Sequence, residues 1–302
     1  MSGELSRVLV TGATGNIGGY LVRRLTERSS VTAVPCYRKP ADAEAFRSLG
    51  LSPVPLDMDR PESAREALSG IDILFLLKPY TIRMLIQSKI MLDAARSAGV
   101  RHVIHLGAHG ADDIPWATIG WNHMVERYVE ALGFGWTHLR PNFFMDNLLR
   151  SARPLTDEDG NPADLPEARV THFLGERPIS WISCRDIAAV AAAVIQNPQA
   201  HHGKVYPLAV QQCSMPGLAV MLSELTGRQY RYQRLSPETG FEMMTKLGRE
   251  PEFVRPWLDY MAAVADGKVP GTEAVFDNIE PLTGEKPTLL EDFIRENRER
   301  FS

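Results

Sequence analysis

Short apolar segments alternate with amphipathic segments along the first half of the chain. Strands are predicted near residues 7–11, 31–36, 52–56, 71–77, 103–106 and 136–139. The run 71–77 is almost entirely apolar, which is typical of a strand buried on both faces. Helices are predicted at about 81–98 and 121–131, each closed by a glycine. This alternation predicts an α/β fold with a doubly wound parallel sheet, the Rossmann arrangement, covered by helices on both faces.

The pattern changes after about residue 150. Residues 154–169 are rich in proline, glycine and acidic side chains, and we expect a loop there. Helices are then expected at 183–195, 216–226, 237–247 and 252–265, with short strands at 204–208 and 229–232. We therefore expect a first domain over residues 1–150. A smaller C-terminal α/β lobe over residues 151–302 would be interleaved with the first sheet around residues 179–208.

The first predicted strand leads directly into three glycines, Gly12, Gly15 and Gly18, spaced three residues apart. An amphipathic stretch follows, so the order is strand, tight turn, helix. This arrangement places a pyrophosphate on the free backbone N–H groups of a helix N-terminus. We expect the turn residues to bind a dinucleotide: Gly12, Thr14, Gly15, Asn16 and Ile17. The alternative is a glycine-rich turn without a ligand, but the surrounding strand and helix favour the binding site.

The end of the second predicted strand indicates which dinucleotide binds. A NAD site carries an Asp or Glu about 20 residues beyond the glycines, but here the strand ends in Tyr37-Arg38-Lys39-Pro40. The planar guanidinium of Arg38 can bind a 2′-phosphate with two hydrogen bonds, and Lys39 adds a second positive charge. NADP(H) is therefore favoured over NAD(H). Two solvated loop cations are the alternative.

Composition narrows the class of protein. The 302 residues are 44% hydrophobic and 23% charged, with a net charge of −4, which is ordinary for a globular protein. The absence of a basic run argues against a nucleic-acid partner. No apolar run is long enough to span a membrane. Three well-separated cysteines without a CxxC pair indicate a reduced, cytoplasmic protein.

The chain resembles the NmrA-like branch of the atypical short-chain dehydrogenase/reductases over essentially its whole length. The matching segments are residues 11–18, Arg38, 56–59, 98–104, 122–129, 137–147 and 182–190. The resemblance implies that Asp57 and Met58 lie beside the adenine. It implies that Leu77, Lys78 and Pro79 lie under the ribose and nicotinamide. It also implies that four residues line the nicotinamide end: Pro141, Asn142, Phe143 and Phe144.

Several of these assignments have structural alternatives. Asp57 could instead serve a turn or a helix N-terminus. Lys78 could simply mark the end of its strand, and one of the two phenylalanines, Phe143 or Phe144, is expected in the core.

The chain departs from the conventional Ser and Tyr-x-x-x-Lys set of the superfamily. The fifth strand is followed by Gly107 with no serine, and Thr118 and Asn122 stand at the Tyr and Lys positions. Neither Thr nor Asn is an acid near neutrality, so ordinary alcohol dehydrogenase chemistry is not expected. The expected catalytic residues are Asn122, facing the cofactor, and His109 as a proton donor at the carboxyl end of the sheet. His109 could also be a plain loop histidine.

Hydride transfer to a quinone or an azo group can proceed if the site stacks cofactor and acceptor and excludes water. Members of the resembling branch include NADPH-dependent quinone and azo reductases, whereas others bind the dinucleotide as redox sensors for a protein partner. We expect a reductase of a small aromatic acceptor. A non-catalytic sensor and an imine or ene reductase are the alternatives, and a homodimer is left open.

Two further expectations concern the remaining side chains. No metal site is expected, because the histidines lack the spacing of a ligand set. Methionines and aromatic residues of the C-terminal helices could form an adaptable apolar pocket for a flat substrate, or simply pack the core: Met243, Met244, Phe253, Trp257 and Met261.

Overall fold

The computed structural model describes residues 5–27, 30–154 and 167–301. Seven parallel strands form the central sheet in the order β11-β6-β5-β4-β1-β2-β3. Their bounds are β1 Ser6–Val10, β2 Val31–Tyr37, β3 Val54–Pro55, β4 Ile73–Leu76, β5 His102–Leu106, β6 Gly135–Pro141 and β11 Lys204–Leu208. The order reverses between β1 and β4, and ligands bind at such a switch point in doubly wound sheets. The predicted Rossmann fold is confirmed.

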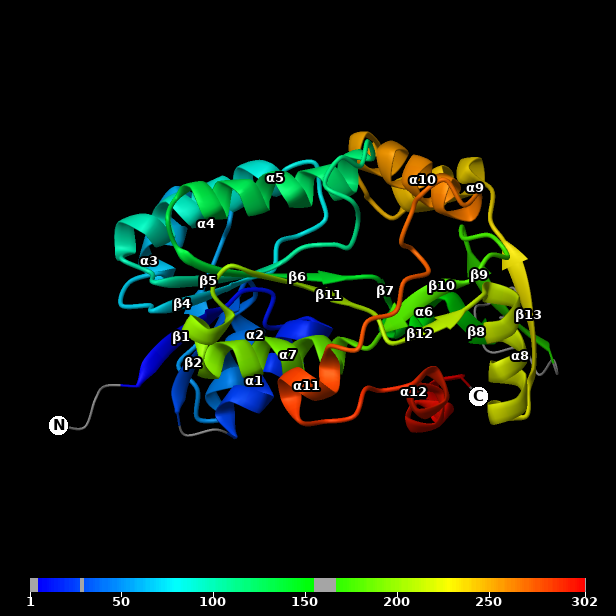
Figure 1. Cartoon of the computed structure of the whole chain (residues 1–302), viewed down its shortest axis with the longest axis horizontal. Helices are drawn as coiled ribbons and strands as arrows, with labels where there is room; N and C mark the ends of the chain where they lie inside the picture. The colour runs from blue at the N-terminus through cyan, green and yellow to red at the C-terminus, as the bar shows by residue number, and fades with distance from the viewer. Residues whose placement is uncertain (1–4, 28–29, 155–166, 302) are drawn as a thin grey trace.

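Helices cover both faces of this sheet (Figure 1). One face carries α3 (Pro61–Ala67), α4 (Met84–Ala98) and α5 (Ala117–Ala131). The other carries α1 (Asn16–Thr26), α2 (Pro40–Arg47), α7 (Cys184–Gln196) and α11 (Ile279–Thr283). Each face has its own apolar core, so alternate residues of β1 point to opposite cores: Val8 and Val10 to one, Leu9 to the other.

The remaining elements form a second layer of structure beside the carboxyl ends of the strands (Figure 1). Two three-stranded sheets lie there. One contains β7 (Phe143–Phe144), β10 (Ile179–Ile182) and β12 (Gln211–Cys213), and the other contains β8 (Ala152–Pro154), β9 (Glu167–His172) and β13 (Gln229–Arg234). The short helix η2 (Pro198–His201) lies apart from them, beside the amino end of β6, where Thr137 Oγ1 donates to His201 O at 2.8 Å. The helical elements of this layer are η1 (Met145–Asn147), α6 (Leu148–Ser151), α8 (Met215–Thr226), α9 (Pro237–Lys246), α10 (Pro251–Ala265), α12 (Leu290–Glu296) and α13 (Arg298–Phe301). A third apolar core, which includes Trp181, Leu218 and Phe301, joins them.

Several predicted bounds differ from the structure. The strands expected at 52–56 and 71–77 are shorter, and α5 begins four residues before the expected Trp121. The loop expected at 154–169 is wrong at both ends, because Pro154 ends β8 and Arg169 lies in β9, and these strands pair in an antiparallel manner. Residues 155–166 lie outside the described residues.

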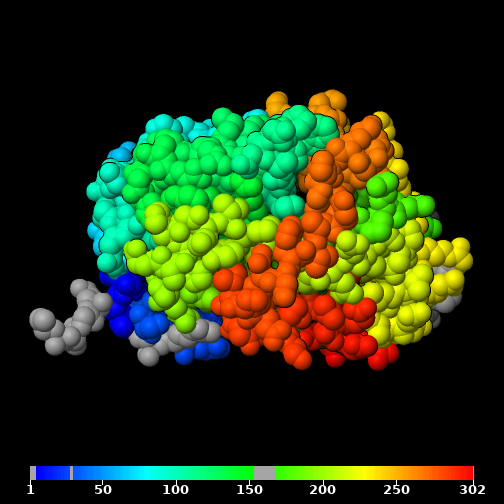
Figure 2. All heavy atoms as spheres, in the orientation of Figure 1, coloured from blue at the N-terminus to red at the C-terminus, as the bar shows by residue number. Residues whose placement is uncertain are grey.

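The chain returns to the first domain through a C-terminal segment, residues 266–290. It leaves α10, crosses the face shown in Figure 2 as a continuous orange band, and reaches α11 and then α12. Its backbone is bonded to the layer beneath, since Ser180 N donates to Thr272 O at 2.8 Å and Phe276 N donates to Ala209 O at 2.8 Å. Among the described residues, no helix is both long enough and apolar enough to cross a membrane.

Candidate dinucleotide and acceptor site

The glycine turn after β1 has the conformation and close packing that its sequence predicts. Gly12 has a φ of +64°, which favours glycine. A Cβ on Gly18 would lie 2.2 Å from the carbonyl oxygen of Gly12, so only glycine lets α1 approach the turn this closely. Thr11 fixes the turn to β4, because its Oγ1 accepts a hydrogen bond from Leu77 N at 2.7 Å.

The N-terminus of α1 is left without a side-chain cap. Gly15 occupies the N-cap position and makes no side-chain hydrogen bond. The first backbone N–H groups of a helix have no partner within it, and they carry the positive end of the helix dipole. Gly15 and Asn16 line a groove at this point together with Thr14. The side chain of Ile17 packs in the core, so only its backbone amide is placed to meet a ligand.

A first pocket lies at the carboxyl ends of β1, β2 and β4. It brings together seven residues expected to bind the cofactor: Gly12, Thr14, Arg38, Asp57, Met58, Leu77 and Pro79. Arg38 is exposed there and makes no hydrogen bond or ion pair with another described residue. Lys39 is exposed at the N-cap of α2 and does not line this pocket. The structure therefore favours Arg38 over Lys39 as the cation that faces a ligand.

Acidic side chains in this pocket are already engaged. Asp57 Oδ1 accepts a hydrogen bond from Asp59 N at 3.0 Å, so Asp57 lines the pocket and also holds its own turn. Asp59, which sequence reasoning did not assign, accepts hydrogen bonds from Arg83 Nε at 2.6 Å and Gln87 Nε2 at 3.0 Å. The guanidinium of Arg83 lowers the pKa of Asp59, and Gln87 assists. These pairings leave Arg38 as the free charge in the pocket among the described residues.

A second pocket adjoins the first beyond β4, because Pro79 lines the first pocket and Tyr80 the second. All four residues expected at the nicotinamide end line the second pocket: Pro141, Asn142, Phe143 and Phe144. Trp257 and Met261 of α10 also line it, which agrees with an adaptable apolar pocket. Phe253 is buried and packs edge-on against Tyr80, whereas Met243 is 42% exposed and neither it nor Met244 lines the pocket.

Sequence reasoning missed several lining residues of the second pocket. Tyr80, Thr118, His172 and Tyr260 come from four separate elements or loops. Only Tyr80 carried a usable signal, because it directly follows Leu77, Lys78 and Pro79, which were expected at the cofactor. Burial lowers the pKa of His172 to about 4, so its imidazole is neutral at neutral pH.

Lys78 and Asn122 line neither pocket, so their expected contact with the cofactor stays a prediction. Lys78 points into the protein, and its Nζ lies 2.6 Å from each of three acceptors: His105 Nε2, Leu106 O and Asn122 Oδ1. These contacts satisfy the donors of the amine, while burial lowers its pKa to about 7. Asn122 is fully buried and donates from Nδ2 to Thr118 O at 2.8 Å and to the Tyr80 hydroxyl at 3.3 Å.

His109 also lies outside both pockets, so the geometry does not support its expected role as proton donor. Its backbone N–H is bonded to Pro141 O at 2.9 Å. Its ring packs against Phe276, with the ring centroids 5.2 Å apart, under the C-terminal segment. Burial and the nearby Arg140 lower the pKa of His109, so the ring is neutral at neutral pH.

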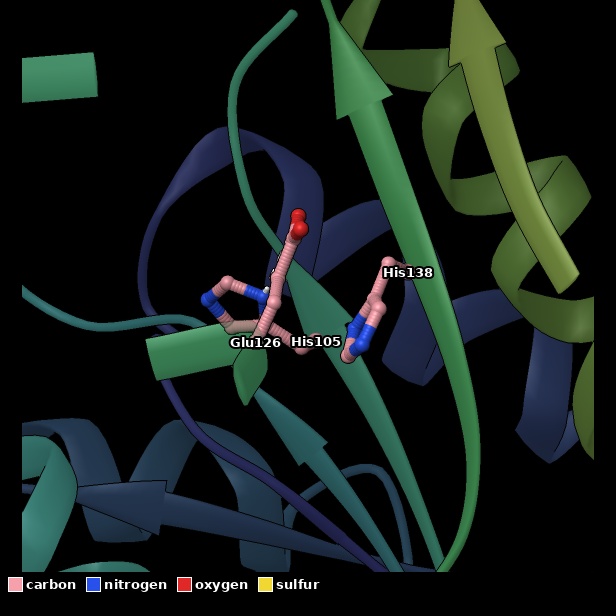
Figure 3. A group of neighbouring side chains, drawn as sticks. All are labelled: His105, Glu126 and His138. Atoms are coloured by element: carbon pink, nitrogen blue, oxygen red, sulfur yellow. Dashed lines mark ion pairs between the residues drawn. The ribbon is translucent and has the colours of Figure 1, made fainter. Parts of the chain in front are cut away.

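Three buried side chains behind the second pocket form a cluster that spacing along the chain did not reveal. His105 and His138 are paired residues of β5 and β6, and Glu126 reaches them from α5 (Figure 3). Their ligand atoms lie within 4.8 Å of one another. Glu126 is fully buried and bonded to Arg140, with Arg140 Nε to Glu126 Oε1 at 3.0 Å.

This cluster resembles a metal-ligand set, but it already holds two cations. Arg140 occupies both carboxylate oxygens of Glu126, and Lys78 occupies His105 Nε2. An added metal ion would compete with one cation and face the other at short range. The expectation that this protein has no metal site stays a prediction.

Glu126 also explains why no serine follows β5. A Cβ on Gly107 would lie 2.9 Å from Glu126 Oε1. The conventional serine would therefore collide with a buried, charge-paired carboxylate.

Comparison with known proteins agrees with this fold. A model of the NmrA-like family matches residues 4–294. The chain belongs to the NmrA-like family. This NmrA-like protein is 30% identical over 296 residues to the NAD(P)H azoreductase of Xenophilus azovorans, covering 97% of this chain and 99% of that one. It is 29% identical over 234 residues to quinone oxidoreductase 2 of Escherichia coli, covering 76% of this chain and 78% of that one.

Solved structures share the fold over nearly the whole length of this NmrA-like protein. An NADPH-dependent quinone oxidoreductase of Escherichia coli, crystallised with NADPH, matches with a TM-score of 0.78 and 25% identity, covering 96% of this chain and 99% of that one. The triphenylmethane reductase of a Citrobacter species, crystallised with NADP(H), matches with a TM-score of 0.77 and 22% identity, covering 96% and 99%.

Proposed function

We propose that this protein is an NADPH-dependent reductase that transfers hydride directly to a quinone-like or azo-type aromatic acceptor. The observation that carries the proposal is the pair of adjoining pockets. The first collects the residues suited to a phosphorylated dinucleotide, and the second is lined largely by aromatic and apolar side chains. Relatives named as an azoreductase and a quinone oxidoreductase support the same class of reaction.

The residues of the first pocket fit a dinucleotide with a 2′-phosphate. The uncapped N-terminus of α1 offers backbone N–H groups to the pyrophosphate, and Gly18 brings the helix close to the turn. Arg38 offers an unpaired guanidinium, which binds a phosphate with two hydrogen bonds. When bound, the reduced nicotinamide would supply the hydride.

The second pocket suits a flat acceptor that stacks against the cofactor. Phe143, Phe144 and Trp257 offer aromatic surface, while Ile119 and Met261 offer apolar contacts. Such a lining excludes water from the reacting atoms and holds the partners in a reactive orientation. The missing Ser and Tyr-x-x-x-Lys set argues against alcohol oxidation, and quinones and azo groups do not require that set.

The test is oxidation of NADPH by the purified protein, followed by the absorbance of the reduced nicotinamide. The acceptor panel contains benzoquinones and naphthoquinones, azo dyes and cationic triarylmethane dyes, each with a protein-free blank. The proposal predicts saturable turnover of at least one quinone or azo dye and a lower KM for NADPH than for NADH, with the triarylmethane dyes as acceptors that need no proton. Tight NADPH binding without turnover of any acceptor would contradict it and favour a redox sensor.

A further inference from the structure

A continuous set of hydrogen bonds leads from the buried amine of Lys78 to a hydroxyl in the second pocket. Lys78 Nζ donates to Asn122 Oδ1 at 2.6 Å, and Asn122 Nδ2 lies 3.3 Å from the Tyr80 oxygen. The same Nδ2 donates to Thr118 O at 2.8 Å. Asn122 is fully buried, so these contacts are shielded from water.

The direction of these hydrogen bonds is set by the chemistry of the partners. A carbonyl oxygen such as Thr118 O can only accept, so the amide nitrogen of Asn122 must face it. The amide oxygen then faces Lys78, which donates. Asn122 therefore presents an N–H to Tyr80, and the Tyr80 oxygen accepts. The proton of the Tyr80 hydroxyl makes no hydrogen bond to any other described residue, which leaves it for an acceptor in the pocket.

Tyr80 lies where the two pockets adjoin, and the reduced acceptor would need a proton there. It lines the second pocket directly after Leu77 and Pro79, which line the first. The residue lines the pocket and is 39% exposed as a whole, while Phe253 packs edge-on against its ring at a centroid distance of 6.1 Å. Burial raises the pKa of Tyr80 and the Asn122 hydrogen bond opposes this rise, so the hydroxyl stays protonated at neutral pH.

We propose that Tyr80 is the catalytic proton donor to the reduced acceptor, and that Asn122 and Lys78 position it. This inference rests on the proposed function. It replaces the Tyr and Lys of the conventional set with residues from the end of β4. Thr118 and Asn122, which stand at the conventional positions, lie on α5, so the acid is supplied instead by the segment that follows β4.

The proposed step balances in atoms and charge. A quinone or azo group that gains a hydride carries a negative charge on oxygen or nitrogen. The O–H bond of Tyr80 breaks, its proton bonds to that heteroatom, and the electron pair stays on the Tyr80 oxygen. The N–H of Asn122 stabilises the resulting phenolate, which then regains a proton from solvent.

Acceptors that differ in their need for a proton test the proposal. A cationic triarylmethane dye gains a hydride at its central carbon and becomes neutral, so it needs no proton. Tyr80→Phe should lower kcat for a quinone or azo dye about 100-fold, the lower end of the usual contribution of a general acid, and leave the cationic dye unchanged. Asn122→Asp should act in the same direction, because a carboxylate would accept the Tyr80 proton and turn it away from the pocket.

A matched control and a binding measurement accompany these variants. Tyr128→Phe makes the same chemical change on α5, where the hydroxyl is bonded to Asp93 and lines neither pocket, and both activities should be retained. Quinone binding to the NADP⁺ complex is measured by quenching of tryptophan fluorescence. Loss of the Tyr80 hydrogen bond should weaken this binding about 2- to 10-fold.

Other outcomes separate the failure of this inference from that of the proposed function. Equal losses with quinone and cationic dye in Tyr80→Phe would overturn the inference, because Tyr80 would then only shape the pocket. Unchanged quinone turnover and binding in Tyr80→Phe would also overturn it. So would a loss of quinone turnover in Tyr260→Phe, the other tyrosine of the pocket, with no loss in Tyr80→Phe. If wild-type protein reduces no acceptor, the proposed function fails. Quinone binding unaffected by Tyr80→Phe would then reject the Tyr80 contact as well.

Discussion

We expect Arg38 to decide which dinucleotide this protein prefers, because it is the unpaired guanidinium in the first pocket. A hydrogen bond to a charged group contributes about 1.5–3 kcal/mol, so Arg38→Gln should weaken NADPH binding about 10- to 100-fold. NADH lacks the 2′-phosphate, and its affinity should change little. Lys39→Gln is the matched control, since Lys39 does not line the pocket. Calorimetric titration with both dinucleotides checks this, and an unaltered preference for NADPH would show that Arg38 does not bind the phosphate.

Burial of Lys78 should make the free energy of unfolding rise with pH above about pH 7. Burial lowers its pKa from 10.5 to about 7, and Glu126 partly opposes this. Between these values the unfolded chain binds one proton more than the folded protein, so the free energy of unfolding rises with pH by about 1.4 kcal/mol per unit. From about pH 7.5 to 9.5 the wild type should therefore gain about 2–3 kcal/mol over Lys78→Met in urea unfolding.

Lys89 provides the control for this pH dependence. It is exposed and paired with Asp93, and this pair raises its pKa. Lys89 stays protonated in both states over that pH range, so the difference between wild type and Lys89→Met should be constant. A constant difference for Lys78→Met as well would mean that the amine keeps its ordinary pKa.

At the scale of elements, α1 carries two adjacent glycines with opposite constraints. A Cβ on Gly18 would lie 2.2 Å from Gly12 O, whereas one on Gly19 would lie 3.5 Å from Ala13 O, an ordinary contact. Gly18→Ala should lower the free energy of unfolding by about 1–3 kcal/mol and weaken NADPH binding by displacing the turn. Gly19→Ala should stabilise the helix by about 0.5–1 kcal/mol. The measurement is the midpoint of thermal unfolding, Tm, of both variants. Equal shifts in Tm would mean that α1 does not pack on the turn as described.

Sequence patterns predicted some of the elements and contacts and missed others. The glycine turn and the buried strands were predictable because each depends on neighbours in the chain, whereas the placing of residues 141–144 came from the family resemblance. α2 and α3 were missed, although Pro40 and Pro61 at their first positions are a known signal of a helix start. The contacts of Lys78 with His105 and Asn122 were not predictable, because three elements far apart in sequence must first be packed together.

At the scale of the whole molecule, the C-terminal segment 266–290 links the second pocket to the first domain. At one end Asn142, which lines the pocket, donates to Gly271 O at 3.3 Å. At the other end Asp186 of α7 accepts hydrogen bonds at 2.8 Å from both N and Oγ1 of Thr288. Because Asp186 is buried, it fixes the segment to a rigid helix inside the protein. The shape of the acceptor pocket therefore depends on an anchor in a different part of the fold.

Asp186→Ala should release this anchor. It leaves the buried N–H of Thr288 without a partner, which costs about 1–3 kcal/mol in the free energy of unfolding. Hydrogen exchange should become faster in residues 284–290, and the KM for the acceptor should rise more than the Kd for NADPH, since the segment is bonded to Asn142 of the second pocket. Asp292→Ala, which removes an exposed pair with Arg295, should cost less than about 1 kcal/mol and leave exchange and KM unchanged. If Asp186→Ala instead weakened NADPH binding as much as acceptor binding, the segment would act on the whole molecule and not through Asn142.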